Sequence, residues 1–335
     1  METIRILALD GGGIRGLFTS EFLIRFCDQA GLDPSRLFEH FDLILGTSIG
    51  GLQAMAYADG HTPETMKQFF YERGPVIFKD HGILPGYKAR VVMGLSTDST
   101  FYKQEDLKEA IKAIVGEKSL GEIGGRVVIP SWSMSENFPQ LFSNIPNYEP
   151  YLSGRDNRAC DVGLATSAAP LYFPKASFND KEYIDGGVIQ NNPALLGLLI
   201  GKRLFPNRNR VCLLSVGTGS AWPQQGSVLP EVDGENSIVP SNVRYMYYLL
   251  DDVFIGGVQS LTSRTLSFLA KSIYEQFFYL RFQYRFPEGE DAPMDEAKKE
   301  YLDKLVTLSK NRYEGRQTEI TNFINHFNLN APWSV

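Results

Sequence analysis

The sequence predicts an α/β fold in which helices on both faces cover a central, mainly parallel β-sheet. Between residues 4 and 58, a strand-like apolar run passes twice through a glycine-rich turn into a helical pattern. Further apolar runs at residues 126–132 and 210–216 are separated from these units by helical segments. Strands that alternate with helices pair in parallel, because each helix carries the chain back across the sheet before the next strand begins.

The first two strand-and-helix units are the clearest elements. Residues 4–9 are expected to form a strand that ends at an aspartate and three glycines, and residues 17–26 follow with large apolar side chains at helical spacing. Residues 41–45 form the second expected strand. It leads through a serine-containing turn into a helix of small and apolar residues at 52–58.

The later elements are predicted from the same signals. Residues 126–132 and 210–216 read as buried strands, residues 160–169 as a helix, and residues 183–184 as the end of a further strand. Together with the first two units, they predict a core that spans residues 1–220.

The C-terminal part has a different character. Residues 221–240 are rich in Gly, Pro, Ser and acidic residues and are expected to be a linker or mobile loop. Residues 243–286 are dense in aromatic side chains, and residues 294–327 show the pattern of one charged amphipathic helix. We expect residues 221–335 to be a helical or lid region packed on the core, in one continuous domain.

Composition restricts the classes of function. The chain has 335 residues, of which 43% are hydrophobic and 21% charged, as in ordinary globular proteins. A formal net charge of −6 argues against a nucleic-acid polymer as partner and leaves any membrane contact to local features of the surface. Neither a disulfide framework nor a cysteine zinc site is expected, because three cysteines lie far apart: Cys27, Cys160 and Cys212.

Localisation is predicted from the same reading. The chain starts with strand-like sequence in place of a secretion signal. The apolar run at residues 194–200 is far shorter than the roughly 20 residues that a membrane-spanning helix requires. We therefore expect a cytoplasmic protein, with peripheral contact at the inner face of the membrane.

Ser48 is the candidate nucleophile, because it lies between two glycines in the G-x-S-x-G turn of residues 46–50. Such a turn bends sharply from a strand into a helix and holds the serine hydroxyl outward, and glycine is needed where a side chain would clash. The strand before this turn and the helix after it provide the context that the motif requires. The alternative is a serine that only caps the helix beginning at Ile49.

A second turn contains the consecutive glycines Gly11, Gly12 and Gly13 at the start of a helix. Their unobstructed backbone N–H groups could bind a developing oxyanion or a phosphate group. The turn also satisfies G-x-G-x-x-G, so a dinucleotide site is an alternative, although the next strand ends in the serine turn and not in an acidic residue. A phosphate-binding P-loop does not fit, because Gly16 is followed by apolar residues and not by Lys and Ser/Thr.

Asp185 opens a third turn, Asp-Gly-Gly, again at the end of an expected strand. We expect all three turns at the carboxyl edge of the parallel sheet, where ligands bind, although a plain turn is the alternative for this one. Asp185 could take the proton of Ser48 directly if burial raised its pKa. A Ser-His-Asp triad stays open if one of four distant histidines folds back: His40, His61, His81 or His326.

In these motifs the chain resembles the patatin-like phospholipases. The matching segments, in family order, are DGGGIRG at residues 10–16, GTSIGG at 46–51, ATSAAP at 165–170 and DGG at 185–187. The resemblance covers about residues 4–217 and implies the three-layer patatin-like fold and hydrolysis of acyl esters in phospholipids or galactolipids. It implies a catalytic dyad of Ser48 and Asp185. It further implies an oxyanion hole from Gly11, Gly12 and Gly13.

The same resemblance implies that no metal and no organic cofactor takes part. Arg15 matches the family arginine beside the glycine loop, which implies a supporting role; an ordinary surface arginine is the alternative. Asn191, Asn192 and Pro193 also recur after the family aspartate, and we expect them to shape the loop and cap the helix that follows.

In length and in its helical, aromatic-rich C-terminal part, the chain is similar to compact bacterial patatin-like enzymes, among them anti-phage phospholipases that cyclic nucleotides activate. This similarity implies a phospholipid membrane surface as substrate and a cyclic nucleotide as activator, and it leaves the oligomeric state open. We expect the aromatic side chains of residues 243–286 to be core, with a lid or a membrane contact as alternatives. A ligand-binding regulatory module of the same fold without turnover is the alternative function.

Overall fold

The computed structural model describes residues 2–79, 100–148, 150, 152–220, 256–272, 276–287, 290 and 292–328. The expected linker at residues 221–240 and the first aromatics of the 243–286 stretch lie outside the described residues. Within the described part, the strands are β1 (Thr3–Leu9), β2 (Leu43–Gly46), β3 (Val127–Ser133), β4 (Phe138–Ser143), β5 (Ala176–Phe178), β6 (Lys181–Asp185), β7 (Arg210–Val216) and β8 (Phe277–Phe282).

The described strands form one sheet in the order β5-β6-β3-β2-β1-β7-β8, with β4 paired to β3. The centre of the sheet is parallel, since β1 pairs in parallel with β2 and β7, β2 with β3, and β7 with β8. The antiparallel pairs are β3 with β4, β3 with β6, and β5 with β6. The predicted mainly parallel sheet is confirmed, whereas β8 lies in a segment for which the sequence reading expected no strand.

Helices surround this sheet. They are α1 (Gly16–Ala30), α2 (Leu37–His40), α3 (Ile49–Ala58), α4 (Pro63–Ile77), α6 (Gln104–Val115), α7 (Ala159–Ser167), α8 (Gly187–Gln190), α9 (Ala194–Leu204), α11 (Gly257–Ser272), α12 (Lys299–Glu314) and α13 (Gln317–Asn328). Short 3-10 turns lie at η1 (Gly13–Arg15), η2 (Pro34–Arg36) and η3 (Leu120–Glu122).

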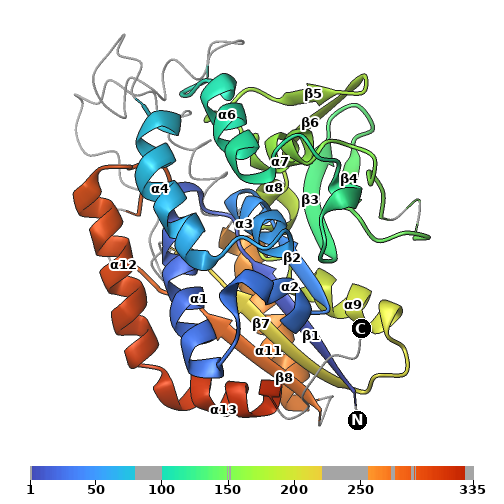
Figure 1. Cartoon of the computed structure of the whole chain (residues 1–335), viewed down its shortest axis with the longest axis vertical. Helices are drawn as coiled ribbons and strands as arrows, with labels where there is room; N and C mark the ends of the chain where they lie inside the picture. The colour runs from blue at the N-terminus through green and yellow to red at the C-terminus, as the bar shows by residue number, and fades with distance from the viewer. Residues whose placement is uncertain are drawn as a thin grey trace.

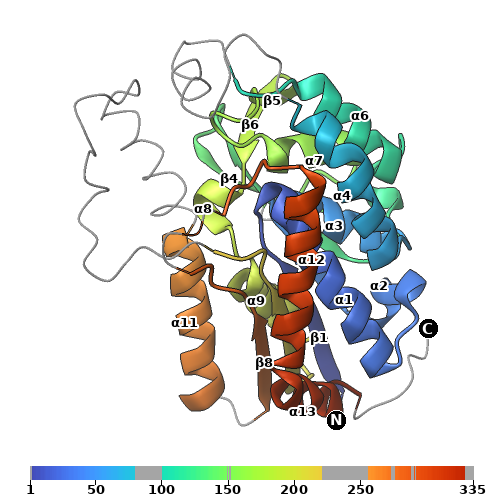
Figure 2. The ribbon, with the colours of Figure 1, turned by 90° about the vertical axis from the view of Figure 1, so that its left-hand side faces the viewer.

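The sheet separates two apolar cores, because successive side chains of a strand point to opposite faces. On β1, Leu7 and Leu9 belong to the larger core, with α1, α3, α4, α12 and α13, while Ile4 and Ile6 belong to the smaller core, with α9 and α11. Figure 1 shows α1, α4 and α12 together on one side of the sheet, and Figure 2 shows α11 on the other side. The predicted helices on both faces are confirmed.

The C-terminal helix prediction was wrong in one respect. Residues 294–327 were expected to form one helix, but α12 ends at Glu314 and α13 begins at Gln317. A single helix of that length would extend about 50 Å in one direction. The break lets α12 pack along α1 while α13 packs against β7 and β8.

Most described aromatics of the 243–286 stretch are core, as predicted. Phe277, Phe282 and Phe286 are buried, and the Phe282 ring stacks on Phe22 of α1 with 4.0 Å between ring centroids. Phe268 on α11 is the exception, with 62% of its surface exposed. Because β8 extends the sheet and α12 contacts α1, the described C-terminal elements are parts of the same layers as the N-terminal ones.

Candidate active site

Ser48 lies on a sharp turn between β2 and α3. Its backbone has φ 56° and ψ −127°, a conformation that a residue with a side chain adopts only under constraint from its surroundings. The two flanking glycines permit this turn, since a Cβ on Gly46 would lie 1.9 Å from the carbonyl oxygen of Gly50, and a Cβ on Gly50 would lie 2.4 Å from that of Leu9. The Ser48 side chain makes no helix-capping hydrogen bond, so the capping alternative is wrong.

Ser48 and Asp185 line the same cavity, and the Ser48 side chain is near enough to the Asp185 carboxylate to lower its pKa. Asp185 is only 4% exposed, and its Oδ1 accepts a hydrogen bond of 2.6 Å from the backbone N–H of Gly187. Burial raises the pKa of Asp185 to about 7 from an ordinary value of 3.8, against the opposing effects of the nearby Ser48 side chain and the Gly187 N–H. Asp185 therefore has the pKa that a general base needs near neutral pH.

The two residues meet in a way that the sequence reading did not predict. We expected all three turns at the carboxyl edge of a parallel sheet, but β6 runs antiparallel to β3, with Ser131 opposite Asp185. β2 pairs with the beginning of β3, at Val127 and Val128, so β2 and β6 occupy successive stretches of that strand and run toward each other. Their carboxyl ends meet head-on, which brings Ser48 and Asp185 together.

Helix α7 and the residues directly after it hold the backbone of Ser48 and of Asp185 in place. The backbone N–H of Ser48 donates to Thr166 Oγ1 at 3.0 Å, and the Thr166 hydroxyl donates to the carbonyl oxygen of Pro130 at 2.6 Å. The N–H of Asp185 donates to the carbonyl oxygen of Ala168 at 3.0 Å. The ATSAAP motif thus fixes the backbone of both residues, a role that was not assigned from the sequence.

The glycine loop lies beside this pair. Gly12 and Gly13 line the same cavity as Ser48 and Asp185, and their N–H groups have no acceptor within the described residues. Gly11 differs, because its N–H donates to the carbonyl oxygen of Asn191 at 3.3 Å. The N–H of Gly11 is thus already used, whereas those of Gly12 and Gly13 are available to the predicted oxyanion.

The glycines are also required by close packing. A Cβ on Gly12 would lie 2.2 Å from Thr218 Oγ1, and one on Gly13 would lie 2.2 Å from the carbonyl oxygen of Met294. Gly13 moreover has φ +56°, which glycine adopts without strain.

Arg15 is 5% exposed, so the surface alternative is wrong. Its Nη1 donates to the carbonyl oxygen of Ala292 at 2.8 Å, and its backbone N–H donates to that of Gly12 at 3.2 Å. The side chain is not among the cavity-lining residues. Arg15 thus connects the glycine loop to the segment before α12 and supports the loop without facing the cavity.

The cavity in front of Ser48 is apolar and has a volume of about 80 Å³. Its walls include aliphatic and aromatic side chains from α3, α4, α6 and the segment after α7: Leu52, Phe69, Phe70, Ile77, Leu107 and Phe173. Such a lining suits an acyl chain, because burial of each methylene contributes about 0.8 kcal/mol.

No histidine of the described residues lines this cavity, and His81 lies outside them. His326, for example, lies at the far end of α13, with its ring stacked on Phe278 and hydrogen-bonded to Arg210. The triad alternative therefore has no support in the described part of the chain, where no group of His, Cys, Asp and Glu side chains could hold a metal ion either. None of the described helices is both long and apolar enough to cross a bilayer.

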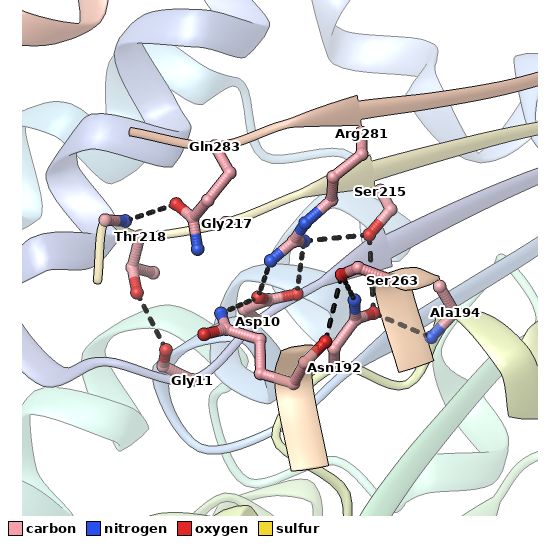
Figure 3. Close-up of polar contacts among 12 residues, drawn as sticks. Asp10, Gly11, Asn192, Ala194, Ser215, Gly217, Thr218, Ser263, Arg281 and Gln283 are labelled. Atoms are coloured by element: carbon pink, nitrogen blue, oxygen red, sulfur yellow. Dashed lines mark hydrogen bonds and ion pairs between the residues drawn. The ribbon is translucent and has the colours of Figure 1, made fainter. Parts of the chain in front are cut away.

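Side chains from β8 and α11 hold Asp10, the residue directly before the loop of Gly11, Gly12 and Gly13, in place (Figure 3). Asp10 is fully buried, and Arg281 of β8 donates from Nη1 to its Oδ1 at 2.9 Å, while Gln259 of α11 donates to its Oδ2. Thr218 Oγ1 donates to the carbonyl oxygen of Gly11 at 2.8 Å. Arg281 was not predicted as a site residue, although a lone arginine within the apolar run of β8 indicates a buried acidic partner.

Asn191 and Asn192 have the structural role that was expected. The carbonyl oxygen of Asn191 accepts a hydrogen bond from the N–H of Gly11. Asn192 Oδ1 accepts one of 3.0 Å from the N–H of Ala194 at the start of α9. Figure 3 shows that Asn192 also joins the hydrogen-bond network of Ser215 and Ser263.

Comparison with known proteins agrees with this geometry. The family model described as Patatin-like phospholipase matches residues 7–198, more than half of the chain. The chain belongs to the patatin-like phospholipase family. Its motifs, their order and the contact between Ser48 and Asp185 lie within the matched segment.

Individual relatives fall into two groups. Patatin-like protein 2 of Arabidopsis thaliana is 32% identical over 338 residues, which cover 90% of this chain and 81% of that protein. The cGAMP-activated phospholipase of Vibrio cholerae serotype O1 is 35% identical over 205 residues, which cover 58% of this chain and 57% of that protein. Among solved structures, VipD of Legionella pneumophila is 12% identical over 96% of this chain and 67% of its own, with a TM-score of 0.45.

Proposed function

We propose that this protein is a phospholipase A-type lipid acyl hydrolase in which Ser48 is the nucleophile and Asp185 the general base. The observation that carries the proposal is that Ser48, on its constrained turn, lines one apolar cavity together with the buried carboxylate of Asp185. Membership of the patatin-like phospholipase family supports the substrate class.

In this mechanism, Ser48 Oγ attacks the ester carbonyl as its proton passes to Asp185. The negative charge that develops on the carbonyl oxygen is stabilised by the N–H groups of Gly12 and Gly13. Asp185 returns the proton to the leaving alcohol, which departs as a lysophospholipid. Asp185 then takes a proton from a water molecule that attacks the acyl-enzyme, and it returns this proton to Ser48 Oγ as the fatty acid is released.

We also propose that the enzyme acts from the cytoplasm on the inner face of the membrane and that a cyclic nucleotide activates it. The support for the activator is that three relatives of 32–35% identity are named cGAMP-activated phospholipases. These matches cover 58–65% of this chain, whereas the Arabidopsis match covers 90%. Activation by a cyclic nucleotide is therefore proposed separately from the hydrolysis of phospholipids.

Fatty-acid release from phosphatidylglycerol–phosphatidylethanolamine vesicles, with and without 3′,3′-cGAMP and other cyclic nucleotides, tests both claims. We expect hydrolysis that at least one cyclic nucleotide increases. Hydrolysis that is equal across the panel would remove the activator and leave the hydrolase. A non-catalytic ligand-binding module would release no fatty acid under any of these conditions.

The raised pKa of Asp185 predicts a pH profile. Because only the carboxylate can accept the Ser48 proton, kcat/KM should be constant above pH 7 and fall by about tenfold per pH unit well below it. Initial rates on an uncharged soluble ester between pH 5 and 9 measure this profile without changing the charge of the substrate. A rate that stays constant down to pH 5 would contradict Asp185 as the base.

A further inference from the structure

A second, polar pocket lies behind the glycine loop, between α11, β8 and α12. Its volume of about 460 Å³ is within the range of small-molecule binding sites. Its lining is rich in arginine, glutamine and serine, and none of the described residues that form it is acidic. The four arginines are Arg264, Arg281, Arg285 and Arg312.

The charge of this pocket is only partly neutralised. Arg281 is paired with Asp10, whereas Arg264 has no hydrogen bond or ion pair with any residue that the structure describes. Arg312 donates from Nε to the carbonyl oxygen of Gln283 at 3.0 Å, and partial burial together with the nearby Arg316 lowers its pKa. Because none of the described lining residues is acidic, the guanidinium groups of Arg264 and Arg312 favour a ligand with several anionic oxygens, and phosphate matches their paired N–H donors.

The pocket shares its wall with the support of the glycine loop. Two of the lining residues, Gln259 and Arg281, donate hydrogen bonds to the carboxylate of Asp10, directly before Gly11 (Figure 3). A third lining residue, Gln283, accepts at Oε1 from the N–H of Gly219 at 2.7 Å. A ligand in this pocket would thus contact the side chains that position the proposed oxyanion donors.

We propose that this pocket binds an organic phosphate with more than one phosphate group and thereby regulates the glycine loop. The inference rests on the proposed function, since it assigns a place to the activator of the same active site. A cyclic dinucleotide and the headgroup of a phosphoinositide share this chemistry, so the test uses a soluble example of each.

The test measures equilibrium binding of 3′,3′-cGAMP and of inositol 1,4-bisphosphate by titration calorimetry, with guanosine as a probe without phosphate. The protein carries Ser48→Ala, so binding is measured without any turnover. We expect one of the two phosphates to bind, guanosine not to bind, and the further change R264Q/R312Q to weaken binding by about tenfold or more. Arg203→Gln, an exposed arginine of α9 outside the pocket, is the matched control and should leave Kd unchanged.

Two results would overturn the proposal: no binding of either phosphate, or equal binding by R264Q/R312Q and by the protein with intact arginines. The phosphate that binds identifies the source of the ligand. With Ser48 intact, the ligand should raise vesicle hydrolysis, and R264Q/R312Q should remove this increase. Failure of hydrolysis with intact binding would contradict the proposed function and leave the pocket assignment standing.

Discussion

Replacing Ser48 by alanine should reduce fatty-acid release from phospholipid vesicles by about 10⁴-fold or more, since no acyl-enzyme can form. The change removes one oxygen from a half-buried side chain whose backbone conformation is fixed by Gly46, Gly50 and Thr166. The fold should therefore persist. Rates of fatty-acid release and the thermal unfolding temperature of the same preparation measure the two effects.

Ser177→Ala is the matched control, because Ser177 is an exposed serine of β5 that does not line the cavity. It should hydrolyse vesicles at the wild-type rate. Retained hydrolysis in Ser48→Ala, or equal loss in both variants, would contradict Ser48 as the nucleophile.

Asp185→Asn should lower kcat by about 10⁴-fold, because an amide cannot accept the Ser48 proton. The substitution keeps the shape of the side chain and its Oδ1, which accepts from the N–H of Gly187. Asp180→Asn is the matched control: this exposed aspartate lies in the β5–β6 turn, where its φ of 56° suits asparagine well. Wild-type hydrolysis by Asp185→Asn would show that another group is the base.

The same substitution should affect stability in a pH-dependent way. The pKa of Asp185 is about 7 in the folded protein against 3.8 ordinarily, so the folded state holds a proton that the unfolded state has lost. The resulting stabilisation is complete below pH 4 and is lost as the pH rises to 7, a change of about 4 kcal/mol in the free energy of unfolding. Relative to wild type, Asp185→Asn should therefore become more stable between pH 4 and pH 7, as denaturant unfolding at each pH can measure.

The sequence was sufficient to predict the central parallel strands and the two residues that meet at the site. Residues 4–9 and 41–45 are short apolar runs followed by glycine turns, a local pattern that does not depend on the rest of the fold. The direction of β6 could not be predicted in this way. Strand direction is set by pairing with β3, which is distant in sequence, and the expectation of one common carboxyl edge was wrong for that reason.

Two details of the site depend on contacts between distant segments. Whether Gly11 donates to an oxyanion or to Asn191 is decided by the loop after β6, which no local pattern shows. Arg281 and Gln259 lie more than 240 residues from Asp10, in a part without diagnostic motifs. The sequence indicated them only through composition, because each is a polar side chain in an element that is otherwise apolar or amphipathic.

The central claim is that Ser48 is a nucleophile that Asp185 activates. Reaction with a fluorophosphonate ester, followed by mass spectrometry of the digested protein, tests it most directly. A single adduct on the peptide that contains Ser48, which forms rapidly in the wild type and at least about 100-fold more slowly in Asp185→Asn, is the predicted result. An adduct on another residue, no adduct at all, or equal rates in the two proteins would contradict the dyad.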